Sequence, residues 1–210
     1  MNFVIPATIP RAALITEGPQ QAAIAVALAQ AGFATALQAH GDADLRDGTV
    51  PLLANLMDER QTAALIERAA TAIGPIGVLV NGAAARRRDS WDDATRATWD
   101  MHIETNVRAP FVLIRHFAGA LPAANEGVVI NLLDQRICPQ LVSYTLSKAA
   151  LWTLTQTMAL ALAPRIRVNG IVMGKAPGEE EIGQAVLAIL ALSSMTGQMI
   201  APGGVPPTAA

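Results

Sequence analysis

The sequence predicts an α/β fold: a single domain, 1–210, built on one doubly wound parallel sheet of about seven strands with helices on both faces. Strand-like and helix-like segments alternate from residue 11 to residue 201. The strand-like segments are apolar throughout, which is typical of parallel strands buried on both faces. The 210 residues are 52 % hydrophobic and 15 % charged, which is enough for one substantial core. Residues 1–10 and 205–210 are expected to be flexible tails.

Hydrophobic periodicity and end signals define the first six elements. In order they are a strand at 11–16, a helix at 22–31, strands at 33–38 and 50–53, a helix at 58–73 and a strand at 76–81. Asp58 is a preferred residue at a helix start, and Gly32 and Gly74 are typical of helix ends. A Gly18-Pro19 turn separates the first strand from the first helix.

The second half of the chain continues the alternation. In order it contains a long helix from Asp92 that carries Asn106, a strand at 127–132, a helix around Tyr144 to about Ala163, a strand at 167–172, a helix at 179–192 and a strand at 197–201. In doubly wound sheets, ligands bind beyond the carboxyl ends of the strands. Thr16, Gln38, Asn81 and Asp134 lie at such ends, so the sequence predicts a site at this edge of the sheet.

Composition and charge exclude several classes of function. The net charge is −2, and the one basic cluster, Arg86 to Arg88, is short and lacks interleaved aromatic residues, so no nucleic-acid partner is expected. No apolar run approaches the roughly 20 residues of a membrane span, and the N-terminus has no signal-peptide pattern. The single cysteine, Cys138, excludes an internal disulfide and lacks the neighbours of a metal site. We therefore expect a cytoplasmic protein without a bound metal or a membrane partner.

Tyr144 and Lys148 form a candidate catalytic pair. They are four residues apart on a predicted helix, so the phenol and the ammonium lie on the same face, one turn apart. A nearby cation favours the ionised phenol and lowers its pKa, which makes tyrosine a usable acid or base near neutral pH. Asn106 and Asp134 could complete a four-residue site around the phenol.

Structural alternatives remain open for each of these residues. Tyr144 and Lys148 could be solvated side chains on a helix surface. Asn106 could make a helix-kink hydrogen bond, and Asp134 could be a loop cap. Three further polar residues are expected to lie outside the site: Ser143 as a helix cap, Ser147 on a solvated face and His102 as an incidental residue.

Several stretches between about residue 11 and residue 204 resemble the short-chain dehydrogenase/reductase family, which has a Rossmann-like fold. They are ALIT, LVNGAA, ETNVRAPF, VVINLLDQR, SYTLSKAAL, PRIRVNGI and MTGQMIAPGG. By this resemblance, Tyr144 is the proton donor, Lys148 binds the nicotinamide ribose and tunes the tyrosine, and Asn106 holds a water. Asp134 stands where most members have serine, and an aspartate there is typical of the pteridine-reductase-like branch.

The resemblance implies binding of NADP or NAD, and hydride transfer from the reduced cofactor, NADPH or NADH, to a C=O or C=N bond of a small substrate such as a pterin. It also implies a homodimer or homotetramer packed through the two long helices that contain Asn106 and Tyr144. The cofactor-binding residues that it implies are Thr16, Gly18, His40, Asn55, Asn81, Gly82, Ala83 and Lys148.

The first turn departs from the family's T-G-x-x-x-G-x-G pattern. The turn is about two residues shorter than in the family. The glycines of the family's pattern let the backbone approach a pyrophosphate. Glu17 adds a negative charge there, and Pro19 removes an N–H donor. Near the second strand the chain offers His40, followed by Asp42 and Asp44, and Asn55 stands where the family often has an aspartate.

Two other loops at the ligand edge are also short. The loop from Asp134 to Tyr144 is shorter than is usual in the family, and residues 172–177 lead almost directly into the final helix, so the substrate-covering lid is largely missing. Two hypotheses follow. The chain is an NAD(P)H-dependent reductase, or it is a non-catalytic relative, a pseudoenzyme that acts as a binding or assembly module.

Overall fold

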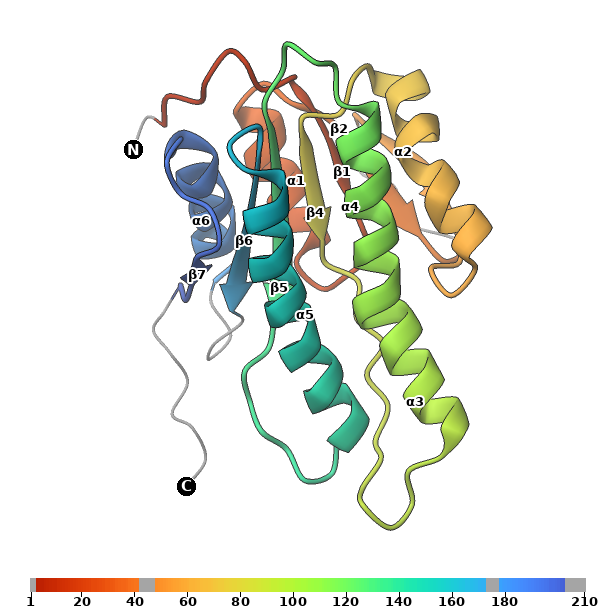
Figure 1. Cartoon of the computed structure of the whole chain (residues 1–210). Coiled ribbons are helices and arrows are strands. Elements are labelled where there is room, and N and C mark those ends of the chain that lie inside the picture. The colour runs from red at the N-terminus through yellow and green to blue at the C-terminus, as the bar shows by residue number, and fades with distance from the viewer. Residues whose placement is uncertain (1–2, 42–47, 173–177, 203–210) are drawn as a thin grey trace.

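The computed structural model describes residues 3–41, 48–172 and 178–202 and confirms the predicted sheet. Its described part contains seven parallel strands in the order β3-β2-β1-β4-β5-β6-β7 (Figure 1). The strands are β1 (Ala12–Ile15), β2 (Ala34–Ala39), β3 (Thr49–Leu53), β4 (Val78–Asn81), β5 (Gly127–Leu133), β6 (Ile166–Val172) and β7 (Met199–Ile200). The helices are α1 (Gln21–Gln30), α2 (Glu59–Ile73), α3 (Arg96–Ile103), the π-helix η1 (Glu104–Arg108), α4 (Ala109–Ala120), α5 (Val142–Leu162) and α6 (Glu179–Ala191).

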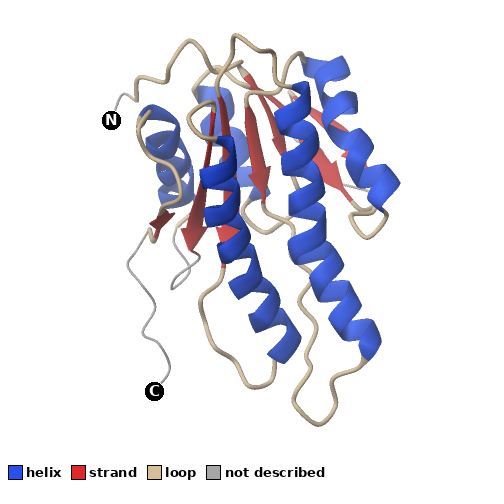
Figure 2. Ribbon diagram, viewed as in Figure 1, coloured by secondary structure: helices blue, strands red, loops and turns tan. Residues whose placement is uncertain are grey.

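Helices cover both faces of the sheet (Figure 2). Ala13 and Ile15 of β1 belong to a core cluster with α1 and α6, whereas Ala12 and Leu14 belong to a second cluster with α2 and α4. Successive side chains of a strand point to opposite faces, so a strand buried on both faces must be apolar throughout. The described helices include none with the length and apolarity needed to cross a membrane.

The predicted cap of α2 is confirmed, whereas the long helix predicted from Asp92 begins later. Asp58 Oδ1 accepts hydrogen bonds from the N–H groups of Arg60 at 2.9 Å and Gln61 at 3.2 Å. The other helix begins after Thr95. Thr98 N donates to Thr95 Oγ1 at 3.2 Å and Thr95 N donates to Thr98 Oγ1 at 3.0 Å, and these two bonds form a capping box. This helix is then interrupted by η1, so one predicted helix is α3, η1 and α4 in succession.

The N-terminal segment departs from the flexible tail that the sequence predicts. Ile9 is 1 % exposed and Ile5 is 8 % exposed, and both belong to the core cluster under α1 and α6. Glu126 N donates to Thr8 O at 3.1 Å and so fastens this segment to the loop before β5. The predictions for residues 205–210, for Asp42 and Asp44, and for the short connection at 173–177 lie outside the described residues.

The sheet order brings two turns together at one edge. β1 lies between β2 and β4, and the chain reverses its direction of winding between β1 and β4. This topological switch point is where doubly wound sheets hold their ligands. The first half of α5 and all of α3 extend beyond the same edge (Figure 1).

Candidate active site

Thr16 joins the turns that follow β1 and β4. Its side chain is 1 % exposed, and Oγ1 accepts hydrogen bonds from Gly82 N and Ala83 N, both at 2.9 Å. A Cβ atom at Gly18 would lie 2.6 Å from Gly82 O, so this crossing of two backbones requires glycine at position 18. The structure thus brings together four of the predicted cofactor-binding residues, Thr16, Gly18, Gly82 and Ala83.

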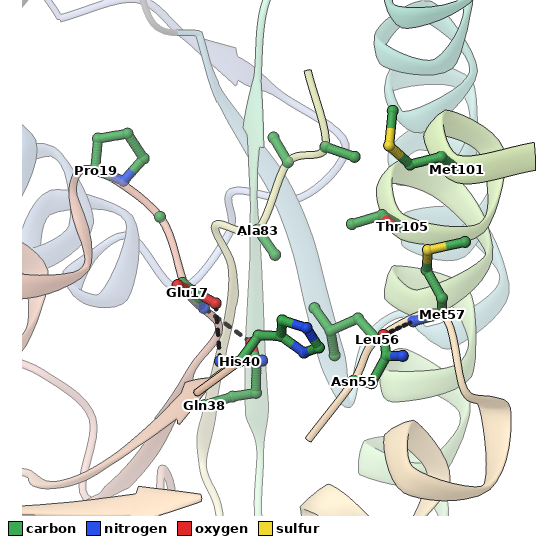
Figure 3. A pocket seen from close by; sticks show the side chains of 13 residues that line it. Glu17, Pro19, Gln38, His40, Asn55, Leu56, Met57, Ala83, Met101 and Thr105 are labelled. Atoms are coloured by element: carbon green, nitrogen blue, oxygen red, sulfur yellow. Dashed lines mark hydrogen bonds between the residues drawn. The ribbon is translucent and has the colours of Figure 1, made fainter. Parts of the chain in front are cut away.

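A cavity of about 380 Å³ opens beside these turns (Figure 3). It is lined by Glu17, Gly18, Pro19, Gln38, His40, Asn55, Leu56, Met57, Ala83, Ala84, Ala85, Met101 and Thr105. Two further predicted residues, His40 and Asn55, are among them. Asn55 Oδ1 accepts from Met57 N at 3.0 Å, which shapes the loop after β3 at the cavity wall.

Asn81 has a different position from the other predicted cofactor-binding residues. Its side chain is 3 % exposed and does not line the cavity. Asn81 Nδ2 donates to Asn131 Oδ1 at 2.7 Å, and Asn131 Nδ2 donates to Thr155 Oγ1 at 2.8 Å. The amide of Asn81 therefore links β4 through β5 to α5, and a role at the cofactor stays a prediction.

The first turn of α1 has unused backbone donors, although the residues that carry them do not line the cavity. Its N-cap residue, Gln20, makes no side-chain capping bond. The N–H groups of Ala22 and Ala23 have no hydrogen-bond acceptor among the described residues. Such orphan donors, together with the helix dipole, favour anions at a helix N-terminus.

Tyr144 lies close to Asp134, as the four-residue site requires. The phenol is 6 % exposed, and its OH donates to Asp134 Oδ2 at 3.1 Å. Arg136 donates two hydrogen bonds to the same carboxylate, from Nε at 2.9 Å and from Nη2 at 2.6 Å. Burial raises the pKa of Asp134, but the hydrogen bonds and charge of Arg136 outweigh it, so the net pKa lies below its ordinary value.

The expectation that the pKa of Tyr144 is lowered is wrong. Burial raises this pKa well above its ordinary value, and the negative charge of Asp134 raises it further. Lys148 Nζ donates to Leu132 O at 3.0 Å, and no hydrogen bond joins it to the phenol. Arg86 lies over the phenol ring at 5.8 Å and opposes the shift without reversing it. Tyr144 is therefore a protonated donor in this structure.

Lys148 is a buried ammonium that has hydrogen-bond donors without an acceptor among the described residues. It is 4 % exposed, and burial lowers its pKa to about 8 against the opposing charge of Asp134. An ammonium has three donors, and Leu132 O is its one hydrogen-bond acceptor among the described residues. Two donors remain for a bound molecule.

Asn106 lies in η1, where both of its amide donors and its amide oxygen make hydrogen bonds. Asn106 Oδ1 accepts from Ala85 N at 2.8 Å, and Nδ2 donates to Ala85 O at 3.0 Å and to Ser147 Oγ at 2.9 Å. These bonds hold the loop after β4 against α5 across the widened turn of the π-helix. The bonds run to other elements and not to the helix that carries Asn106, and both the water-holding role and the helix-kink alternative stay predictions.

A buried polar network beside Tyr144 was missed from the sequence. His102 Nδ1 lies 2.6 Å from Ser143 Oγ, and Ser143 Oγ donates to Asp89 Oδ2. Arg87 N donates to His102 Nε2 at 2.9 Å, so Nδ1 carries the proton of a neutral ring. Burial lowers the pKa of His102 despite the charge of Asp89, which keeps the ring neutral.

The expected roles of Ser143, Ser147 and His102 are corrected by this network. All three side chains are fully buried, so Ser147 does not face solvent and His102 is not incidental. The His102 ring meets the Tyr144 ring edge-on, with centroids 6.0 Å apart. The sequence offers one signal for Ser147, its place three residues after Tyr144 on the same helix face. It offers none for Asp89.

Comparison with known proteins now identifies the class. The chain is a doubly wound α/β domain with a buried Tyr-Lys pair at the carboxyl edge of its sheet, and a model of the short chain dehydrogenase family matches residues 12–178. The protein belongs to the short-chain dehydrogenase/reductase family.

Two solved structures and two curated proteins illustrate the relationship. FolM alternative dihydrofolate reductase 1 from Brucella canis, complexed with NADP, is 33 % identical over 94 % of each chain, with a TM-score of 0.87. Its counterpart from Brucella suis, also in complex with NADP, is 34 % identical over 91 % of this chain and 92 % of that one, with a TM-score of 0.84. Human L-xylulose reductase is 33 % identical and pig carbonyl reductase [NADPH] 2 is 30 % identical, each over 59 % of this chain and 51 % of the relative. The chain spans about half the length of the curated relatives it matches.

Proposed function

We propose that this protein is an NAD(P)H-dependent reductase that transfers a hydride to a C=O or C=N bond of a small substrate, with Tyr144 as the proton donor. The observation that carries the proposal is the phenol of Tyr144, kept protonated by its burial and by the charge of Asp134, one helical turn from the buried ammonium of Lys148. A protonated phenol is the form that a reduction needs, because the substrate oxygen or nitrogen must receive a proton.

The residues fit a nicotinamide dinucleotide. Lys148 has two unused donors for ribose hydroxyls, Ala22 and Ala23 offer free N–H groups to an anion, and Gly18 leaves no side chain at the crossing of the two turns. When bound, the cofactor supplies the hydride, and the protein supplies orientation and electrostatics. The cavity walls at His40 and Asn55 would hold its adenosine half.

The chain's own residues have distinct tasks in this proposal. Tyr144 gives the proton on Oη to the substrate oxygen or nitrogen. Asp134, fixed by Arg136, orients the phenol through Oδ2, while Lys148 places a positive charge near the developing phenolate. Asn106 holds the loop at Ala85 in place, so its effect on the reaction is one of positioning.

A dihydropterin is the substrate class that we propose to test first. The support is the similarity to two proteins that are described as alternative dihydrofolate reductases, over nearly the whole chain. The pairing of Asp134 with Tyr144, which the resemblance to pteridine reductases implied, also supports it. Simple carbonyl compounds are the second class, because L-xylulose reductase and carbonyl reductase are among the relatives.

The test is steady-state turnover of NADH and NADPH with dihydropterins and with carbonyl compounds. We expect Tyr144→Phe to lower kcat by about 10²–10⁴-fold, the usual contribution of general acid catalysis, while cofactor affinity stays near that of the wild type. Retained cofactor binding serves as the control for folding of the variant. Unchanged turnover in Tyr144→Phe would remove the tyrosine from the mechanism.

The non-catalytic alternative makes the opposite prediction for the wild-type protein. Glu17 and Pro19 at the first turn are the observations that favour it, because a carboxylate and a missing N–H both oppose a pyrophosphate. A pseudoenzyme would show no turnover with either cofactor and any substrate of these two classes. The protein would then have to act through a binding partner.

We also propose a homodimer or homotetramer packed through α4 and α5. Of the apolar residues that the α5 pattern offers, Leu151 is buried in the core, whereas Leu160 is 84 % and Leu146 is 48 % exposed. An interface through α5 would cover these two exposed leucines. Light scattering that gives the mass of a single chain would contradict this assembly. The cytoplasmic location expected from the single cysteine stays a prediction.

A further inference from the structure

Glu17 places a carboxylate at the end of β2, in the wall of the cavity beside the turns that follow β1 and β4 (Figure 3). Glu17 Oε2 accepts from His40 N at 3.0 Å, and Glu17 N donates to Gln38 Oε1 at 3.0 Å. Gln38 is itself fixed, because its Nε2 donates to Ala54 O at 2.9 Å. These bonds hold both the backbone and the side chain of Glu17 against the neighbouring strand, although Glu17 belongs to the turn after β1.

The described cavity lining has a carboxylate but no lysine or arginine. His40 is the one basic side chain among the described residues that line it. Glu17 Oε1 accepts no hydrogen bond from the described residues, so it is free to accept one from a ligand. A carboxylate accepts hydrogen bonds from hydroxyl groups and repels a phosphate dianion. The difference in binding free energy between a hydroxyl and a phosphate is large when the phosphate lies close to the carboxylate.

In dinucleotide-binding folds, an acidic side chain beyond the second strand hydrogen-bonds the adenosine ribose hydroxyls, whereas an arginine there accommodates a 2′-phosphate. We propose that Glu17 makes this protein selective for NADH over NADPH, by accepting from the ribose hydroxyls and by repelling the 2′-phosphate. This selectivity rests on the proposed function, because it requires a nicotinamide dinucleotide in the cavity. It differs from the Brucella FolM structures, which are complexed with NADP.

The experiment is titration of the wild-type protein with NADH and with NADPH, followed by calorimetry and by nicotinamide fluorescence. We expect NADH to bind at least about ten-fold more tightly, the effect of one well-placed charge. Glu17→Gln keeps the size and an acceptor for His40 N but removes the charge, and we expect it to bring the two affinities within about three-fold by improving NADPH binding. Glu67→Gln is the matched control on the outer side of α2. It removes the same charge away from the cavity and should leave the ratio unchanged.

Each outcome decides between separate claims. Equal or tighter binding of NADPH by the wild type overturns the selectivity and leaves the proposed reductase intact. No binding of either cofactor at millimolar concentration overturns both. The wild-type ratio is decisive even if a Glu17 variant fails to fold, and thermal unfolding of each variant identifies that case. Arg46 lies outside the described residues, so Arg46→Ala is included. If Arg46→Ala changed the ratio of the two affinities and Glu17→Gln did not, the selectivity would not come from Glu17 and the proposal would be overturned.

Discussion

At the scale of single residues, burial decides the chemistry of Tyr144 and Lys148. Helical spacing correctly places the two side chains on one face of α5, but the sequence does not show how deeply they lie. Desolvation favours the neutral form of each group, so it raises the pKa of Tyr144 and lowers that of Lys148. The result is a proton donor suited to reduction, where the spacing alone predicts a readily ionised phenol.

The pKa of Tyr144 can be measured directly, because it is the one tyrosine in the chain. In a spectrophotometric titration, we expect phenolate absorbance to appear only well above pH 10 while the fold persists. Asp134→Asn removes a negative charge near the phenol and should lower the Tyr144 pKa, whereas Asp100→Asn on the exposed face of α3 should not.

The same shift has a consequence for stability. The folded-state pKa lies above the unfolded value of about 10, so the unfolding free energy should fall as pH rises past about 10, where only the unfolded chain loses the proton. Circular dichroism along the titration separates ionisation in the folded state from unfolding. A midpoint at or below pH 10 in the folded protein would restore the view that Lys148 tunes the tyrosine.

At the scale of elements, Arg165 and Arg167 each hydrogen-bond to the end of a helix, and the two helices lie on opposite faces of the sheet. Arg167 of β6 donates to the carbonyl groups of Ile189, Leu190, Leu192 and Met195 at the end of α6. Arg165 donates to the carbonyl groups of Ala118 and Leu121 at the end of α4. Residues two apart face the same side of a regular strand, but Arg165 precedes the first residue of β6, so the alternation does not extend to it. The sequence predicts β6 but not these caps.

Arg167→Met should lower the free energy of unfolding by about 3 kcal/mol, because it leaves several buried carbonyl groups at the end of α6 without a donor. Arg115→Met, a change of the same type on α4, should alter it by less than about 0.5 kcal/mol. Denaturant unfolding of the two variants measures both effects. If the two variants proved equally stable, the capping role of Arg167 would be wrong.

At the scale of the whole molecule, the sequence predicts a doubly wound sheet of parallel strands and the edge at which the polar residues gather. Apolar strands and helix end signals are local patterns, so they can be found without the structure. Contacts between segments that are distant in the sequence cannot be found in this way. The bond from His40 to Glu17, the Asp89-Ser143-His102 network and the packing of Ile9 all join residues that no periodicity relates.

The π-helix at Asn106 has both a local and a long-range cause. Pro110 has no N–H to donate to the carbonyl of Asn106, so the sequence held a signal of an irregular turn that the prediction of one long helix did not use. The widened turn also accompanies bonds between Asn106 and the loop at Ala85, 21 residues away in the sequence, which no local pattern shows. π-helical turns are rare and often occur at functional sites. Its position beside the Tyr144 helix places it at the proposed reaction centre, where the chain departs most from regular structure.

The most direct test of the reductase proposal is to follow the hydride itself. The protein is incubated with NADH or NADPH that carries deuterium at the transferred position, together with a dihydropterin or a carbonyl compound, and the product is analysed by mass spectrometry. The account predicts one deuterium in the product formed by the wild type and labelled product formed about 10²–10⁴-fold more slowly with Tyr144→Phe. If no labelled product formed with either cofactor and either class of substrate, the reductase proposal would be contradicted and a non-catalytic role would take its place.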